Sequence, residues 1–150
     1  ARRLFVGTAG WSIPRASAHR LEGEGTHLQR YARLFGSTEI NSSFHRPHRP
    51  ETYARWAEAT PPEFRFAVKM PRTITHEQKL RRARLPLDRF LAECAGLSAR
   101  MGPLLVQLPP SLGFDAEGFS TMPSLDGGDA LDHGVEGFLP GDRLKLAVFT

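Results

Sequence analysis

The chain has 150 residues, of which 40% are hydrophobic and 24% are charged, and no apolar run is long enough to span a bilayer. Such a length allows one domain that buries roughly 68–70% of the surface of its unfolded chain. The single cysteine, Cys94, excludes an internal disulfide and fits a reducing compartment. The basic start of the chain lacks the apolar stretch of a signal peptide, so we expect a soluble, cytoplasmic protein with no membrane partner.

The charge is unevenly distributed along the chain. Residues 1–115 contain 18 Lys and Arg against 10 Asp and Glu, a net charge of +8, whereas residues 116–150 contain 2 against 6, a net charge of −4. A basic region favours anionic ligands, nucleic acid or phosphate surfaces. Basic residues spread over helices more often serve solubility, and that simpler interpretation stays open.

The first elements are expected in the order strand, helix, strand. An apolar run at Leu4–Gly7 predicts a strand, and a Gly-, Ser- and Pro-rich connection follows it. Thr26 and Gln29 form a capping box at the start of a helix whose apolar spacing continues to Phe35. Gly36 supplies the left-handed stop, and residues 38–42 predict the second strand.

The same alternation continues through the middle of the chain. A helix is expected from Pro50 to the residues before Pro61, and a strand is expected at Phe64–Lys69. A third helix is predicted from about Pro86 to Met101, ended by Gly102 and Pro103, with the strand Leu104–Gln107 directly after it. Regular alternation of strand and helix predicts βαβ units with a parallel sheet.

The connections from strand to helix are much longer than those that return from helix to strand. The long ones are residues 8–25, 42–49 and 70–85, and all three lie on the rim at the carboxyl ends of the strands. Long loops in compact domains tend to be functional. A (β/α) barrel has its site at this face. We therefore predict an α/β fold of TIM-barrel-like type, incomplete, with about four βα units.

The pattern ends beyond residue 110. Residues 121–129 are rich in turn formers and read as loop, and only residues 143–150 alternate like a strand. We therefore expect residues 1–115 to form the N-terminal part of the barrel-like domain. Residues 116–150 are expected to form an irregular, acidic, Gly-rich tail of a truncated or frame-shifted chain.

Three of the predicted strands have polar residues at their carboxyl ends. Glu39 and Asn41 end the second, Lys69 ends the third and Gln107 ends the fourth. Alternate residues of a strand face opposite ways, so Glu39 and Asn41 are expected to share one face. Parallel strands bring their carboxyl ends to one edge, where α/β proteins bind ligands. The sequence thus predicts one polar mouth at this edge.

Glu39, Lys69 and His76 are the candidate catalytic residues. A carboxylate and an amine in a partly desolvated mouth shift each other's pKa and can exchange protons with a substrate. The alternative is a structural ion pair inside a barrel. His76, in the long loop after the third strand, can titrate near neutral pH, although histidines in surface loops commonly have no role.

Other residues are candidates for binding. Asn41 and Gln107 can orient a substrate through amide hydrogen bonds or satisfy each other, and Trp11 can stack on a ring or plug the barrel top. His45 and His48 have a spacing that can hold a metal, but the absence of a carboxylate or cysteine cluster beside them argues against a metal site. The sequence contains no motif of the familiar cofactor classes, so the cofactor is left open.

Four ordered motifs together resemble the YecE-like family, also called domain of unknown function 72. They are residues 7–12, residues 39–44, residues 64–69 with 74–77, and residues 102–110. The resemblance implies a TIM-barrel-like fold of about 250 residues, with no established activity. It also implies a polar mouth formed by Trp11, Glu39, Asn41, Lys69, His76 and Gln107.

The chain departs from the family pattern at two places. His45 stands where family members usually have tyrosine, so an aromatic hydroxyl contact is lost. After Asp115 the second half of the family pattern cannot be matched, and four βα units cannot close an eight-stranded barrel.

Three hypotheses for function follow. The first is a small-molecule enzyme that acts on a polar, anionic substrate through Glu39 and Lys69. The second is a nucleic-acid-binding module that uses the Arg-rich segment 81–84 with Trp11, Phe44 and His76 as stacking groups. The third is a fragment without autonomous activity.

Overall fold

A five-stranded sheet organises the part of the chain that the structure describes. The computed structural model of the chain describes residues 4–109 and the backbone of residues 145–148. The sheet has the order β1-β2-β3-β4-β5, in which the first four strands run parallel and β5 pairs antiparallel with β4. The predicted α/β fold is therefore confirmed, and sequential parallel strands are the order of a (β/α) barrel. The strands are β1 (Gly7–Ala9), β2 (Ser37–Ile40), β3 (Arg65–Lys69), β4 (Met101–Gln107) and β5 (Lys145–Val148).

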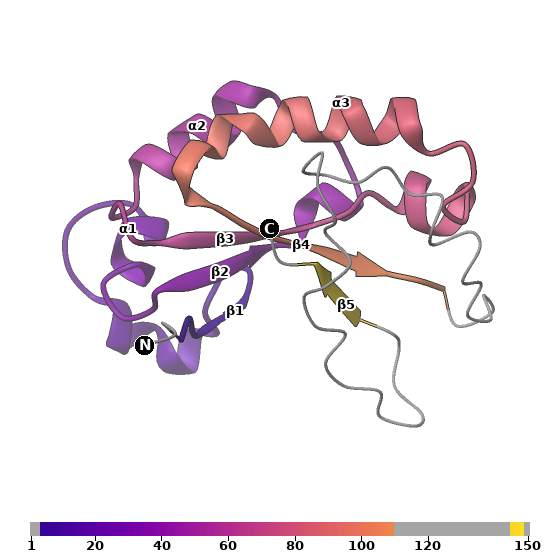
Figure 1. Cartoon of the computed structure of the whole chain (residues 1–150). Coiled ribbons are helices and arrows are strands. Elements are labelled where there is room, and N and C mark those ends of the chain that lie inside the picture. The colour runs from indigo at the N-terminus through magenta and orange to yellow at the C-terminus, as the bar shows by residue number, and fades with distance from the viewer. Residues whose placement is uncertain (1–3, 110–144, 149–150) are drawn as a thin grey trace.

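The helices follow the strands in chain order, and Figure 1 shows α2 and α3 lying together over one side of the sheet. In residues 4–109 no helix is both long and apolar enough to cross a membrane. The α-helices are α1 (His27–Tyr31), α2 (Pro50–Glu58) and α3 (Arg84–Cys94); 3-10 helices lie at η1 (Arg15–Leu21), η2 (Ser42–Phe44) and η4 (Ala95–Arg100), and a π-helix at η3 (Thr73–Glu77).

Successive side chains of each strand point alternately to the helix-facing side of the sheet and to the opposite side. In β3, Phe66 and Val68 are fully buried, whereas Ala67 and Lys69 are only partly buried. The buried residues pack with those of the helices in one hydrophobic core. That core includes Ile40, Leu104 and Val106 from the strands and Tyr53, Ala57, Leu87, Phe90 and Cys94 from α2 and α3.

The predicted capping box of α1 is present, but the helix is shorter than expected. Thr26 Oγ1 accepts a hydrogen bond from the Gln29 amide at 3.2 Å, and Gln29 Oε1 accepts one from the Thr26 amide at 2.7 Å. The α-helix ends at Tyr31 instead of Phe35, because the next turn tightens so that the Leu34 amide bonds the Tyr31 carbonyl.

The prediction for the third helix and the strand after it is wrong at their junction. The α-helix ends at Cys94, and the 3-10 helix that follows contains Ser98 with φ 51°. Gly102 does not stop a helix but lies in β4, where a Cβ would come 2.9 Å from the Phe66 carbonyl oxygen. The register between β3 and β4 shifts at this point, as expected where glycine permits close approach of backbones.

The first strand also begins later than predicted. Leu4 and Val6 are 85% and 58% exposed, and pairing starts only where Gly7 lies beside Ser37. A Cβ on Gly7 would collide with the Ser37 carbonyl oxygen, so the pairing of β1 with β2 requires glycine at this position.

The expected long loops contain short helices, and the tail is described only at one strand. Residues 8–25, 42–49 and 70–85 each include one of the 3-10 or π-helices. The strand expected at residues 143–150 is present as β5. The rest of the expected tail, residues 116–144 and 149–150, lies outside the described residues.

Candidate functional site

Glu39 and Lys69 lie on the same side of the sheet. The register pairs Glu39 with Ala67, and Lys69 is the next residue of β3 that faces the same way. Both are partly buried, opposite the side on which Phe66 packs. Strand alternation, from which the shared face was predicted, thus places both side chains on the side away from α2 and α3.

Lys69 and His76 gather around one aromatic ring at the end of β3. The Lys69 ammonium lies 4.5 Å from the centroid of the Phe44 ring, within the range of a cation–π contact. The His76 ring meets the same Phe44 ring edge-on, with centroids 5.1 Å apart. Phe44, in the segment after β2, therefore contacts both Lys69 of β3 and His76 of η3.

His76 is positioned by the π-helix that replaces the expected loop. Its Nδ1 lies 2.8 Å from Thr75 Oγ1, and Thr75 is fully buried. Burial lowers the pKa of His76, and the charges of Arg72 and Lys69 lower that pKa further. The imidazole is therefore mainly neutral near pH 7, the form that can accept a proton.

Asn41 is not placed by strand alternation, contrary to expectation. The strand ends at Ile40, and Asn41 has the helical backbone angles φ −88° and ψ −23° at the start of a 3-10 helix. Its Oδ1 is buried, and among the described residues it has no hydrogen-bond partner. A buried acceptor without a partner is costly, and the assignment of Asn41 as a substrate-binding residue stays a prediction.

Ser43 joins the ends of β2 and β3, a role that the sequence analysis missed. Its Oγ lies 2.6 Å from the Lys69 carbonyl oxygen and 2.9 Å from the Ile40 carbonyl oxygen, so it can donate its proton to either. The motif at residues 39–44 contains this serine but indicated no role for it, because that role depends on contact between two segments distant in sequence.

Gln107 lies on the same edge but farther along. Leu105 pairs with Lys69, and Gln107 is two residues beyond it with its side chain 8% exposed. Alternation places Gln107 on the side of Lys69. Its assignment as a substrate-binding residue stays a prediction.

Trp11 packs toward the core. Its ring lies 5.2 Å from the Trp56 ring and 6.4 Å from the Phe66 ring, both in edge-on contacts. Phe66 belongs to the helix-facing side, so these contacts separate Trp11 from the side of Glu39 and Lys69. The stacking role expected for Trp11 stays a prediction that would require this ring to leave its aromatic neighbours.

His48 is held by packing and by a hydroxyl group. Its Nε2 lies 2.8 Å from Ser42 Oγ, and its ring contacts the rings of Trp56 and Tyr53. Burial and then the charge of Arg46 lower the pKa of His48. No group of three or more His, Cys, Asp or Glu residues in the described part of the chain could hold a metal ion.

The structure also places an arginine beside Glu39. Glu39 lines a cavity of about 480 Å³ on its side of the sheet, together with Arg65, which the sequence analysis did not select. The alternation in β3 could have placed Arg65 on this side, since Arg65 lies two residues before Ala67.

Cys94 is fully buried, and burial raises the pKa of its thiol to about 12, which keeps it protonated.

Comparison with known proteins gives consistent matches. The family model described as protein of unknown function DUF72 matches residues 5–136. UPF0759 protein YecE from Escherichia coli K12 is 34% identical over 110 residues, which are 73% of this chain and 39% of that protein. The same protein from strain O157:H7 shows the same identity and coverage. The chain thus spans about two fifths of the length of these relatives.

Two crystal structures of a DUF72 family protein from Enterococcus faecalis V583 have the same fold. The structure at 3.10 Å resolution has a TM-score of 0.62 at 23% identity, and the structure at 2.52 Å has a TM-score of 0.57 at 21% identity. Each comparison covers 77% of this chain and 43% of the other. Because the family model matches most of the sequence, the chain belongs to the DUF72 family.

Proposed function

We propose that the carboxyl ends of β2 and β3 bind a small anionic molecule and exchange a proton with it. The observation that favours this most is the arrangement of the Lys69 ammonium, 4.5 Å above the Phe44 ring, with the His76 ring against the same ring. A fixed cation beside a neutral imidazole is suited to an anion that gives up a proton.

The roles of the groups follow from their surroundings. His76 Nδ1 is engaged by Thr75, so Nε2 is the nitrogen left to accept a proton from the ligand. The Lys69 ammonium stabilises the negative charge that this transfer leaves on the ligand. Glu39, on the same side of the sheet as Lys69, and Oδ1 of Asn41, which has no hydrogen-bond partner within residues 4–109, would orient donor groups of the ligand.

A thermal-shift screen tests the proposal. The probes are inorganic phosphate, glycerol phosphate, pyruvate and citrate, and a ligand of the site raises the melting temperature. Lys69→Ala should abolish the shift, and Glu39→Gln should reduce it. Lys79→Ala is the matched control, because Lys79 is exposed in a loop and should leave the shift unchanged. An equal shift in all three variants would refute the site.

An NMR titration of His76 gives a second, independent measurement. Burial lowers the pKa of His76 most, and the charges of Arg72 and Lys69 lower it further, so a bound anion that compensates these charges should raise that pKa. A ligand that raises the melting temperature without moving the His76 titration would bind elsewhere.

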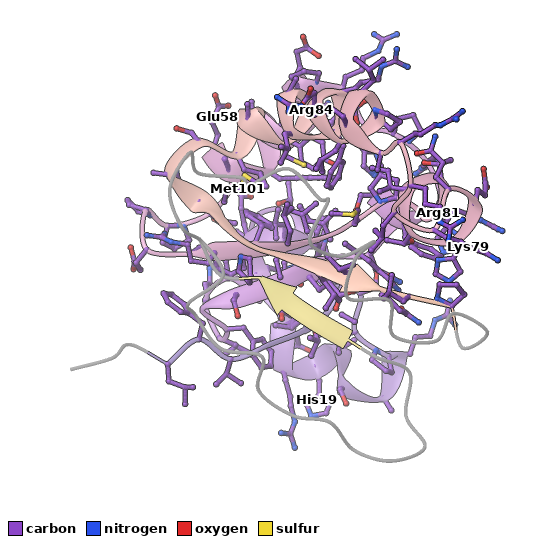
Figure 2. All side chains as sticks on the ribbon, turned by 45° about the vertical axis from the view of Figure 1, so that its right-hand side comes forward. His19, Glu58, Lys79, Arg81, Arg84 and Met101 are labelled. Carbon is purple, nitrogen blue, oxygen red and sulfur yellow. The ribbon has the colours of Figure 1, made fainter. Side chains whose placement is uncertain are left out.

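Nucleic-acid binding is the second candidate function. Figure 2 shows Lys79 and Arg81 extending outward from the loop before α3, and Arg84 extending from the start of that helix. Lys79 and Arg82 adopt left-handed backbone angles, φ 49° and 50°, a strained conformation that is frequent at functional loops. Affinity for single-stranded DNA that falls steeply with salt would favour this function, and salt-independent or absent retention would exclude it.

The third hypothesis, a fragment without autonomous activity, is tested by the same screen. The chain covers 39% of the length of its relatives, and the proposed division at residue 115 lies within a family match that continues to residue 136. A specific binder whose effect depends on Lys69 would refute the inactive-fragment hypothesis for this chain.

A further inference from the structure

A second cavity, of about 400 Å³, lies beside α3 at the carboxyl ends of β2 and β3. It is bounded by residues 43–47 after β2, residues 71–74 after β3 and residues 85–93 of α3. The cavity that Glu39 lines is bounded by other residues, chiefly of β1 to β4. The second cavity is therefore a separate place in the molecule, which shares Phe44 with the Lys69 and His76 cluster.

The interior of this cavity is apolar and stiff. Ile74 and Phe90, which are 1% and 3% exposed, contribute apolar surface to it. Three prolines also line it, and proline has a fixed φ and no backbone N–H to donate. Leu85, at the beginning of α3, lines the cavity and is 80% exposed. These residues form a surface for an apolar group.

Positive charge predominates around the cavity. Arg46, Arg72 and Arg89 come from the three different bounding segments and all line it. The acidic residue of the lining is Glu93, and its pKa is raised mainly by burial. Arg72 also has an exposed ion pair with Glu77 at 3.5 Å, a contact of small energy because both side chains are more than half exposed.

We propose that this cavity binds a small organic anion with an apolar body, either an organic phosphate or a carboxylate. The apolar body would contact Ile74 and Phe90, and the guanidinium groups of Arg46, Arg72 and Arg89 would hold the headgroup. The planar fork of arginine matches both headgroups through paired hydrogen bonds. Ligand sites are commonly about 300–1,000 Å³, so the cavity is large enough for an aromatic ring with its headgroup.

The chemistry of the ligand is tested with four probes in isothermal titration calorimetry of the whole chain. Phenyl phosphate and phenylacetate each combine a ring with an anion, whereas inorganic phosphate and phenol supply only one part. Either combined probe should bind at least about tenfold more tightly than both parts, and comparison of the two shows which headgroup is preferred. Equal affinity for inorganic phosphate, or no binding of either combined probe, would overturn the proposal.

A matched pair of variants on one helix tests the place of binding. Arg89 and Arg84 are both exposed on α3, but only Arg89 lines the cavity. Arg89→Gln should weaken binding of the preferred probe about tenfold, as loss of a charged hydrogen bond does, and Arg84→Gln should leave it unchanged. Arg46→Gln, from another segment, should also weaken it. Equal effects of Arg89→Gln and Arg84→Gln would overturn the assignment.

The same titrations in the Lys69→Ala background separate this proposal from the proposed function. Binding that persists there and still depends on Arg89 supports the second cavity, even if the Lys69 site fails its own test. Binding that disappears with Lys69→Ala and ignores Arg89→Gln assigns the ligand to the Lys69 site and overturns the second cavity.

Discussion

The two sides of the sheet differ in composition although they alternate along the same strands. On the helix-facing side Ile40, Phe66 and Val68 are at most 1% exposed. On the opposite side Glu39 and Lys69 are partly exposed and polar. The difference shows that neighbouring residues of one strand can supply a buried core and a polar face separately, since adjacent side chains never share a face.

The largest effect expected from this comparison is that of Phe66→Ala. Truncation of a fully buried aromatic side chain should lower the free energy of unfolding by about 3–5 kcal/mol through lost burial and the cavity that remains. Ala67→Ser, one residue away on the opposite side, should change it by less than ~0.5 kcal/mol. Urea unfolding of both variants measures the difference, and similar losses would show that the two sides do not differ in this way.

The sequence predicted the features that depend on local pattern. Alternation in residues 64–69 correctly separated Phe66 from Lys69, and the pair Thr26 and Gln29 correctly predicted a capping box. The order of elements followed from the helix and strand periods, which are local properties. The shared side of Glu39 and Lys69 was therefore predictable once the strands were assumed to be parallel.

The sequence did not predict features that depend on contact between distant segments. The Ser43 hydroxyl bonds two strand ends, and Gly102 allows β4 to approach Phe66 closely. Trp11 contacts the rings of Trp56 and Phe66, and the sequence did not reveal which rings would surround it. Residue type alone cannot identify such partners, because the partner is set by tertiary packing.

The next effect concerns how closely the helices approach each other over the core. A Cβ on Gly96 would collide with the Pro50 carbonyl oxygen and come 3.0 Å from the Ala54 amide nitrogen. Gly96→Ala should therefore push η4 away from α2 and lower the free energy of unfolding by about 1–3 kcal/mol. Ala99→Ser, at an exposed position of the same 3-10 helix, is the control. A neutral Gly96→Ala variant would show that this close contact is not required.

A smaller effect should appear as a pH dependence of stability. The pKa of His48 is lowered in the folded protein from its ordinary value of 6.5, so the folded state holds the proton less tightly than the unfolded state. Its contribution to stability is complete above pH 6.5 and is lost as the pH falls through the folded pKa. Urea unfolding across this range measures the loss. His48→Gln should reduce the slope, and a slope that this variant leaves unchanged would contradict the assignment.

The smallest effect on stability is expected where the effect on ligand binding is largest. Lys69→Met removes the cation above the Phe44 ring, a contact of about 0.5–1 kcal/mol, while the thioether keeps most of the side-chain volume. Glu39→Gln keeps the shape of a partly exposed side chain and should cost less than ~0.5 kcal/mol. Urea unfolding measures both, with Phe66→Ala as the reference for a structural residue. If Lys69→Met destabilised the protein as much as Phe66→Ala, Lys69 would be a structural residue, and the difference between the two sides of the sheet would no longer indicate a binding site.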